Sequence, residues 1–345
     1  MKKFVLTGIK KMEMIDAPAP KIVKADDVLL KIDTVGICGS DMHYYNEGKI
    51  GNQVIEFPFS VGHECSAVVV DKGKDVKELE IGQLVAVDPA VSCHECSQCK
   101  SGREHTCLHQ KFLGCPGQME GCLAEYIVLS ERNCFPVAKG ISGEYAALIE
   151  PLSIGWYAAH FLEGQSLAKS IAVLGTGPIG LSVILSLKAG GFNNIYATDK
   201  LDYRLNAAEH AGAVLTGNPD KENVVNKFVD DDEGGLDAVI ECCGKQEAID
   251  QAVELLKPGG ELFIVGIPET DRVSFDISSL RRKEIKIQNI RRQNGGVKPS
   301  IDLSESGKWS ADFMITHKFT PVETGAAFET VAGYKDNVIK AVVKF

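Results

Sequence analysis

Short runs of hydrophobic and β-branched residues occupy the first part of the chain, and each run is bounded by Gly, Pro or Asp. We therefore expect β-strands within residues 26–39, 64–73, 83–91 and 123–129. The first 150 residues are predicted to be mainly β-structure.

The pattern changes near residue 170, where apolar strand-like runs begin to alternate with helical segments. The expected strands are residues 170–177, 193–199, 236–244 and 261–267, and the expected helices are residues 178–190, 201–212 and 246–260. Such alternation predicts right-handed crossover connections and a doubly wound parallel sheet that is covered on both faces. The fold class is therefore predicted to be α/β.

The end of the chain again has the mixed sequence pattern of the first part, with a strand-like run at residues 313–320 and a closing strand expected at 337–345. We expect an α/β domain over residues 153–289, inserted into a domain that is built from residues 1–152 and 290–345. A length of 345 residues agrees with two domains, because single hydrophobic cores usually stop growing below this size.

Composition narrows the possible partners. A net charge of −10 argues against a nucleic-acid partner, which would require clustered Lys and Arg. We see neither a signal-peptide pattern nor an apolar stretch of about 18 residues, so we expect a cytoplasmic protein without a membrane partner. In that reducing compartment the 11 cysteines are expected to serve metals or chemistry, or to be simply buried, rather than to form disulfides.

A glycine-rich motif directly follows the apolar run that starts at residue 170. Gly175, Gly177 and Gly180 have the spacing G-x-G-x-x-G, and a helical segment opens there. In a dinucleotide site these glycines allow a tight turn, close approach of a pyrophosphate and helix packing. Asp199, which ends the next strand, can accept hydrogen bonds from an adenosine ribose and would repel a 2′-phosphate. NAD is therefore favoured over NADP, although the nearby cations of Lys200 and Arg204 weaken this preference. The alternative is a glycine-rich loop without a ligand.

Four cysteines are concentrated at residues 93–107 with the spacing C-x2-C-x2-C-x7-C. Such a cluster fits a closed tetrahedral zinc site, which leaves no coordination position for a substrate and stabilises the loop around it. A redox C-x-x-C pair is the alternative, but the polar flanks do not resemble the helix start of a thioredoxin-like motif. The ligands of this structural zinc are predicted to be Cys93, Cys96, Cys99 and Cys107.

A second candidate metal set is dispersed along the chain. It comprises Cys38, His63, Glu64 and Glu150. Taken singly, these residues have ordinary explanations as a core thiol, a buried histidine and acids at element ends. Together they offer a thiolate, an imidazole and carboxylates, which suit a zinc ion that keeps one position for water or substrate.

The motifs "GICGSDMHYYNEGKIGN", "GHE", the four-cysteine loop, "ALIEPLSIG" and "GTGPIG" resemble, in order and spacing, the zinc-dependent medium-chain dehydrogenase/reductase family. The resemblance covers essentially the whole chain and is greatest to the sorbitol and polyol dehydrogenase branch. It implies a GroES-like β domain formed by both chain ends, a Rossmann domain, and an active site in the cleft between them. It also implies two zinc ions per subunit and a homo-oligomer, either a dimer or a homotetramer.

Residue roles follow from the same resemblance. Cys38, His63 and Glu64 match catalytic zinc ligands, and Glu150 matches an acid that binds this zinc directly or through water. Ser40 and His43 match a proton relay to solvent. The expected cofactor-binding residues are Gly175, Gly177, Pro178, Ile179, Gly180, Asp199, Arg204, Val265, Gly266 and Arg291. The expected substrate residues are Tyr44, Glu150 and Arg291, for which Arg292 is the competing assignment.

The implied function is transfer of a hydride between a secondary alcohol of a small-molecule polyol, such as sorbitol or xylitol, and NAD, which gives the ketose. Threonine 3-, 2,3-butanediol and simple alcohol dehydrogenases of the same family remain alternatives. A non-catalytic zinc- and nucleotide-binding protein is a more remote one, because such a protein would not need the dispersed metal set.

Overall fold

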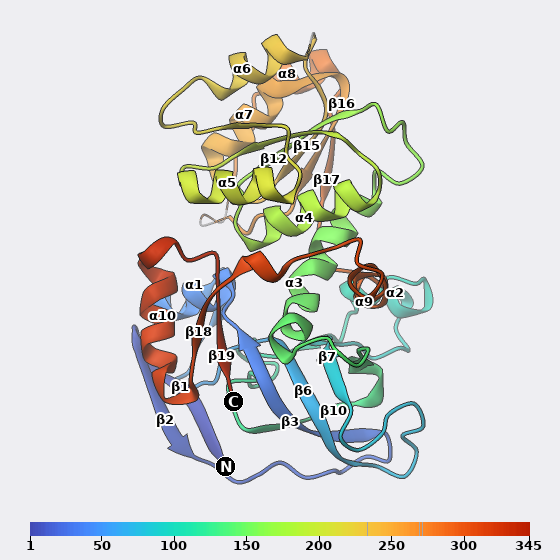
Figure 1. Cartoon of the computed structure of the whole chain (residues 1–345), viewed down its shortest axis with the longest axis vertical. Coiled ribbons are helices and arrows are strands. Elements are labelled where there is room, and N and C mark those ends of the chain that lie inside the picture. Colours follow the sequence, from blue (N-terminus) through green and yellow to red (C-terminus); the bar gives the residue numbers. More distant parts are fainter. Residues whose placement is uncertain (233, 269, 271) are drawn as a thin grey trace. The chain divides into compact units, whose positions relative to one another are not determined.

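A computed structural model describes residues 1–232, 234–268, 270 and 272–345 (Figure 1). The chain forms two compact units, one of residues 1–150 and 311–345 and the other of residues 151–310. The second boundary therefore lies later than the residue 290 expected from sequence. Residues 297–305 form a helix of the second unit, and the preceding Gly296 packs so closely on that unit that an added Cβ would lie 2.6 Å from the Ser153 carbonyl oxygen.

The first unit is built on a seven-stranded sheet with the order β11-β7-β6-β3-β19-β18, in which β10 also pairs with β3. The strands are β3 (Asp27–Gly36), β6 (Glu64–Lys72), β7 (Leu84–Val87), β10 (Tyr126–Ser130), β11 (Cys134–Pro136), β18 (Ile315–Phe319) and β19 (Lys340–Lys344). β3 and β19 are antiparallel neighbours, so the two ends of the chain share one sheet, as the blue and red strands of Figure 1 show. The strands expected in the first part of the chain are confirmed.

Three short pairs and four helices complete this unit. The pairs are β1 (Lys2–Gly8) with β2 (Lys11–Asp16), β4 (Lys49–Ile50) with β5 (Gln53–Val54), and β8 (Ala90–Val91) with β9 (Lys111–Phe112). The helices are α1 (Gly39–Glu47), α2 (Ser97–Lys100), α10 (Thr324–Ala332) and the first part of α3 (Gly143–His160). Buried side chains such as Leu30, Ile32 and Phe328 form one core cluster, which joins β3 to α10.

The second unit contains a six-stranded parallel sheet with the order β14-β13-β12-β15-β16-β17. The strands are β12 (Ser170–Leu174), β13 (Asn194–Thr198), β14 (Leu215–Gly217), β15 (Leu236–Glu241), β16 (Leu256–Ile264) and β17 (Lys286–Asn289). The helices are α4 (Pro178–Ala189), α5 (Asp202–Ala211), α6 (Val224–Asp231), α7 (Gln246–Leu255), α8 (Ile277–Lys283) and α9 (Val297–Glu305). The strand order reverses at β12, which confirms the predicted doubly wound α/β fold.

One predicted helix is shorter than expected. The helical segment expected over residues 246–260 ends at Leu255, and β16 begins at Leu256. Pro258 lacks the N–H that a helix needs, and two glycines follow it, so a strand is better accommodated than another helical turn. Among the described residues, no helix has both the length and the hydropathy that crossing a bilayer requires.

Candidate metal centres and dinucleotide site

Cys38 and the adjacent residues His63 and Glu64 come together although they lie on two separate segments of the first unit. Their metal-binding atoms all lie within 4.8 Å of one another, so this group can hold an ion. Cys38 precedes α1, and its N–H donates to Asp41 Oδ2 at 3.0 Å. Asp41 Oδ1 accepts from the N–H of Gly62 at 3.1 Å, so one buried carboxylate ties both metal-binding segments together.

A glycine makes room for the Glu64 side chain. Gly36 on β3 faces Glu64 on β6 in the sheet register. A Cβ at position 36 would lie 2.4 Å from Glu64 Oε2, well inside contact distance. The carboxylate can therefore enter the metal group only because residue 36 has no side chain.

Polar and aromatic neighbours surround the His63 imidazole. Asp41 Oδ1 lies 3.6 Å from Nδ1, Ser40 Oγ lies 3.5 Å from Nε2, and the Phe112 ring centroid lies 5.3 Å from that of the imidazole. Burial lowers the pKa of His63, but the negative charges of Cys38 and Asp41 outweigh burial and raise this pKa well above its usual value. Metal binding through this imidazole requires its neutral form.

Glu64 also forms a buried ion pair that sequence reasoning missed. Lys340 Nζ, on β19, donates to Glu64 Oε1 at 2.8 Å and to Oε2 at 2.6 Å, and both side chains are 1% exposed. The same ammonium group donates to the Ile37 carbonyl oxygen at 3.1 Å. A single lysine in a short strand carries no local signal of such a pairing, because the partner is distant in sequence.

Glu150 lies on α3 and is 5% exposed, but it is not among the three residues whose ligand atoms cluster. Burial raises the pKa of Glu150 to about 7; the positive charges of His63 and Lys340 lower it and the charge of Glu64 raises it. Glu150 is therefore within electrostatic reach of the group and can hold a proton near neutral pH.

Three other predicted residues lie on α1. Ser40 approaches His63, as described above, and His43 is half-buried. Tyr44 is buried, and its hydroxyl donates to Gln53 Oε1 at 3.2 Å. The helix thus places one hydroxyl at the metal group, while a second hydroxyl hydrogen-bonds Gln53.

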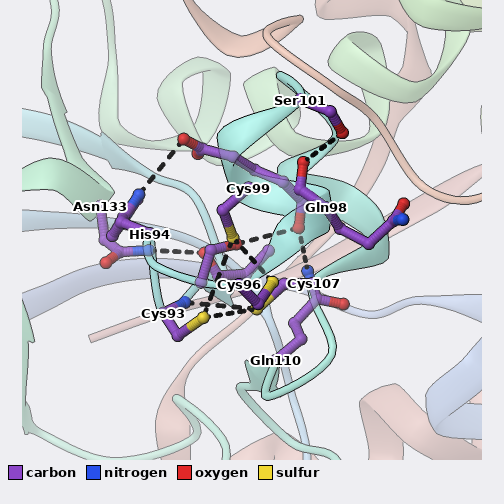
Figure 2. A network of polar contacts seen from close by, with 12 residues as sticks. Cys93, His94, Cys96, Gln98, Cys99, Ser101, Cys107, Gln110 and Asn133 are labelled. Atoms are coloured by element: carbon purple, nitrogen blue, oxygen red, sulfur yellow. Dashed lines mark hydrogen bonds and ion pairs between the residues drawn. The ribbon is translucent and has the colours of Figure 1, made fainter.

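The four clustered cysteines form a second, closed group in the loop between β8 and β9. Figure 2 shows the four sulfur atoms turned toward one another. The Sγ–Sγ distances are 4.0 Å for Cys93–Cys99, 3.6 Å for Cys96–Cys99, 3.9 Å for Cys96–Cys107 and 3.4 Å for Cys93–Cys107. Tetrahedral zinc with sulfur ligands requires about 3.8 Å, so these residues fit such an ion.

Backbone donors stabilise two of the four sulfur atoms in this loop, whereas burial opposes ionisation of a third. Hydrogen bonds from the backbone N–H groups of Cys99 and Leu108 lower the pKa of Cys96 to about 6, whereas burial raises the pKa of Cys99 to about 12. Cys107 Sγ accepts from the N–H groups of Cys93 at 3.3 Å and His109 at 3.4 Å. Such donors stabilise thiolates, which are the form of cysteine that binds zinc.

The glycine motif of the second unit makes the turn that a dinucleotide site needs. Gly175 follows β12 with φ +90°, and Pro178 begins α4. A Cβ at Gly180 would lie 1.9 Å from the Gly175 carbonyl oxygen, so helix and strand can pack only with glycine there. Ile179 and Gly177 lie in the same turn, at the helix N-terminus that favours a phosphate.

Asp199 lies directly beside this turn. Its Oδ2 accepts from the Thr176 N–H at 2.8 Å, and its Oδ1 accepts from the Leu201 N–H at 3.0 Å. Arg204 Nη1 is 3.9 Å from Oδ2. The contact with Thr176 was not expected, because a variable position inside the glycine motif gives no sign of its hydrogen bonds.

The remaining predicted cofactor residues also belong to the second unit. Val265 and Gly266 follow β16, where their N–H groups donate to the Glu241 carbonyl oxygen at 2.8 and 3.0 Å. Arg291, shortly after β17, is exposed, whereas Arg292 is half-buried with φ +53°. Val265 and Gly266 thus lie at the carboxyl edge of the sheet, where ligands of such folds bind.

Comparisons with known proteins identify the family. Residues 24–139 match the alcohol dehydrogenase GroES-like domain and residues 178–306 match the zinc-binding dehydrogenase family. Sorbitol dehydrogenase of Bacillus subtilis is 34% identical over 99% of this chain and 97% of its own length, and D-xylulose reductase A of Aspergillus oryzae is 33% identical over 96% and 94%. The chain belongs to the zinc-binding dehydrogenases and, within them, is most like the polyol dehydrogenases.

Solved structures agree with this assignment. An Escherichia coli oxidoreductase/dehydrogenase of unknown specificity superposes with a TM-score of 0.94 at 29% identity, covering 99% of this chain and 98% of its own. A dehydrogenase from Escherichia coli CFT073 complexed with NADH and one from Sinorhizobium meliloti bound to NADP each have a TM-score of 0.90 at 26% identity, with 100% of this chain and 99% of theirs covered. The predicted GroES-like and Rossmann-type domains are confirmed.

Proposed function

We propose that this dehydrogenase oxidises a secondary alcohol of a small-molecule polyol to the ketose with NAD as the hydride acceptor, and catalyses the reverse reduction. The observation that carries the proposal is the grouping of Cys38, His63 and Glu64 within 4.8 Å. Three ligands suit a zinc ion with a position left for a hydroxyl oxygen. The similarity to a sorbitol dehydrogenase and a D-xylulose reductase supports a polyol as substrate.

Cys38, His63 and Glu64 are called the open group below, because three ligands leave zinc a free position. The residues in and near this group have distinct roles. Cys38, His63 and Glu64 hold zinc, which supplies Lewis acidity, while the dinucleotide supplies the hydride acceptor. Ser40 would accept the hydroxyl proton, and His43 would pass a proton to solvent. Glu150 would hold the zinc directly or through water and, because it can hold a proton near pH 7, would be able to hydrogen-bond a substrate hydroxyl.

Substrate selection is proposed to depend on Tyr44, Glu150 and Arg291, with Arg292 as the alternative cation. A site that hydrogen-bonds several hydroxyls rejects analogues that lack them, because its buried polar groups are then left unpaired. The contact of Tyr44 with Gln53 indicates that Gln53 orients the phenol.

A second zinc ion is proposed for Cys93, Cys96, Cys99 and Cys107, whose sulfur spacing fits a tetrahedron. With four thiolates the ion has no open position, so its role is to stabilise the loop. NAD is proposed over NADP because Asp199 faces the glycine turn with a carboxylate. We further propose a cytoplasmic homo-oligomer.

The alternatives are a threonine 3-, 2,3-butanediol or simple alcohol dehydrogenase, and a non-catalytic zinc- and nucleotide-binding protein. They are separated by the absorbance of NADH produced by the zinc-replete protein with sorbitol, xylitol, galactitol, inositol, butanediol and threonine. We expect the highest kcat/KM with a polyol, and loss of activity when a chelator removes zinc from the open group. A preference for threonine or butanediol would replace the polyol assignment, and no NADH from any alcohol would refute the enzymatic one.

A further inference from the structure

Glu241 is a fully buried carboxylate in the dinucleotide-binding unit that the proposed mechanism does not use. It is the last residue of β15, its exposed fraction is 0%, and it lies at the carboxyl edge of the parallel sheet. This edge is where dinucleotides bind in doubly wound folds. A buried acid at such a position requires a physical explanation.

The carboxylate is only partly satisfied. Oε1 accepts from the N–H groups of Cys243 and Gly244, both at 2.6 Å. Oε2 is buried and makes no hydrogen bond within the part of the chain that the structure describes. Burial raises the pKa of Glu241, and contacts from Cys243, Gly244 and Lys245 act in the opposite direction.

Asp237, on the same strand, shows how a structural acid is usually compensated. It lies near the amino end of β15. Its Oδ2 accepts a hydrogen bond from the Ser170 N–H at 3.1 Å. Its Oδ1 forms ion pairs with Lys257 at 2.7 Å and with Lys169 at 3.7 Å. Glu241 has no such cation among the ion pairs of the described residues. Its negative charge is therefore stabilised by backbone N–H groups and the Cys243 side chain rather than by a cation.

The loops that follow β15 and β16, which belong to the proposed cofactor site, both contact Glu241. The Glu241 carbonyl oxygen accepts from the N–H groups of Val265 and Gly266, and its side chain holds the loop at Gly244. A Cβ at Gly266 would lie 2.7 Å from Oε2 and one at Gly244 would lie 2.2 Å from the Ile267 carbonyl oxygen. The anion thus lies directly beneath the loops at the ends of β15 and β16.

The sheet order indicates which half of a dinucleotide lies above these loops. The glycine turn follows β12 and Asp199 follows β13, so the adenosine half lies on the β12–β13–β14 side. The second half of the fold, β15–β16–β17, then receives the nicotinamide half. The nicotinamide ring is positive in NAD⁺ and neutral in NADH, whereas the pyrophosphate charge is the same in both.

We propose that the buried charge of Glu241 makes the site bind NAD⁺ better, relative to NADH, than an uncharged site of the same shape. This inference rests on the proposed NAD cofactor. The physical reason is the attraction between a poorly solvated anion and the positive ring, which hydride transfer abolishes. Glu241 would thereby favour binding of NAD⁺ and release of NADH, while making the bound NAD⁺ a weaker hydride acceptor, without contacting the substrate.

The test compares dissociation constants of NAD⁺ and NADH for the zinc-replete full chain and for Glu241→Gln, measured by calorimetry near pH 8. Gln keeps the shape and an acceptor oxygen but removes the charge. The ratio Kd(NAD⁺)/Kd(NADH) should rise roughly three- to tenfold in the variant. A tenfold change corresponds to about 30 mV in the potential of the bound couple.

Two further variants separate the effect of the Glu241 charge from a merely structural role of this residue. Asp237→Asn removes a compensated charge from the same strand and should leave the ratio unchanged. Glu241→Asp retains the charge and should weaken both ligands alike. An unchanged ratio in Glu241→Gln, with both affinities reduced equally, would reduce Glu241 to a structural role and overturn the inference. A parent protein that bound neither nucleotide would instead refute the proposed cofactor.

Discussion

Replacing Lys340 by Met should destabilise the first unit strongly, because Lys340 forms the buried ion pair with Glu64. The substitution removes the ammonium group but retains an unbranched side chain of similar length, so packing changes little. Both oxygens of Glu64 then lose their charged partner, and the Ile37 carbonyl oxygen loses a donor. The chain end is affected as well, because Lys340 connects β19 to the start of β6.

The size of the effect follows from burial. Removing one partner of a buried ion pair leaves an uncompensated charge and typically costs about 3–5 kcal/mol. That is a large part of the 5–15 kcal/mol, roughly, by which domains are usually stable. Lys344, on the same strand, pairs with Glu144 at 3.1 Å but has a side chain that is 47% exposed, so Lys344→Met should cost less than about 1 kcal/mol.

The assay is urea unfolding of the chelator-treated protein, followed by near-ultraviolet circular dichroism. The double variant Lys340→Met/Glu64→Gln should recover about 2 kcal/mol or more relative to the sum of the single losses, since neither charge is then left alone. The reasoning would be refuted if the losses in the free energy of unfolding were additive, or if Lys340→Met cost no more than Lys344→Met. Either result would show that pairing of the two charges contributes no stability of its own.

Three further predictions concern the other groups. Cys96→Ser should release one zinc ion and lower the melting temperature while turnover persists at low temperature; metal analysis and calorimetry check this, and an unchanged melting temperature would contradict it. Asp199→Ala should weaken the binding of NAD and reduce the proposed preference for NAD over NADP, measured as the ratio of kcat/KM for the two cofactors. If that ratio did not change, Asp199 would have no role in choosing between them. Because the pKa of folded Glu150 is about 7, above its ordinary 4.5, the metal-free protein should lose stability as pH rises between these values. Glu150→Gln should abolish that slope, which amounts to on the order of 3 kcal/mol, and a slope that persisted would place its source elsewhere.

Local patterns were sufficient for much of the fold. The run before Gly175 and the alternation after it predict β12, α4 and β13, because a parallel sheet with crossover helices imposes that pattern on neighbouring residues. The end of α7 and the boundary after Ser310 were less predictable, since they depend on how Pro258 and Gly296 pack rather than on periodicity.

The residues of the candidate site also differ in how well the sequence alone predicts them. Cys93, Cys96, Cys99 and Cys107 are readable because all four ligands lie in one short loop. The grouping of Cys38 with His63 and Glu64 required a resemblance as well as residue types. Lys340 could not be found from sequence, because it is 276 residues from Glu64 and the two meet only where β19 and β6 both pair with β3.

Chemistry is proposed to occur at the Cys38–His63–Glu64 group and not at the four-cysteine loop. The most direct test is Cys38→Ser in the full chain, with zinc content, melting temperature and NADH production from the preferred polyol measured on one sample. We expect one zinc ion to remain in the four-cysteine loop, the melting temperature to change little, and turnover to be lost. A folded Cys38→Ser protein that still produced NADH at the parent rate would contradict this proposal.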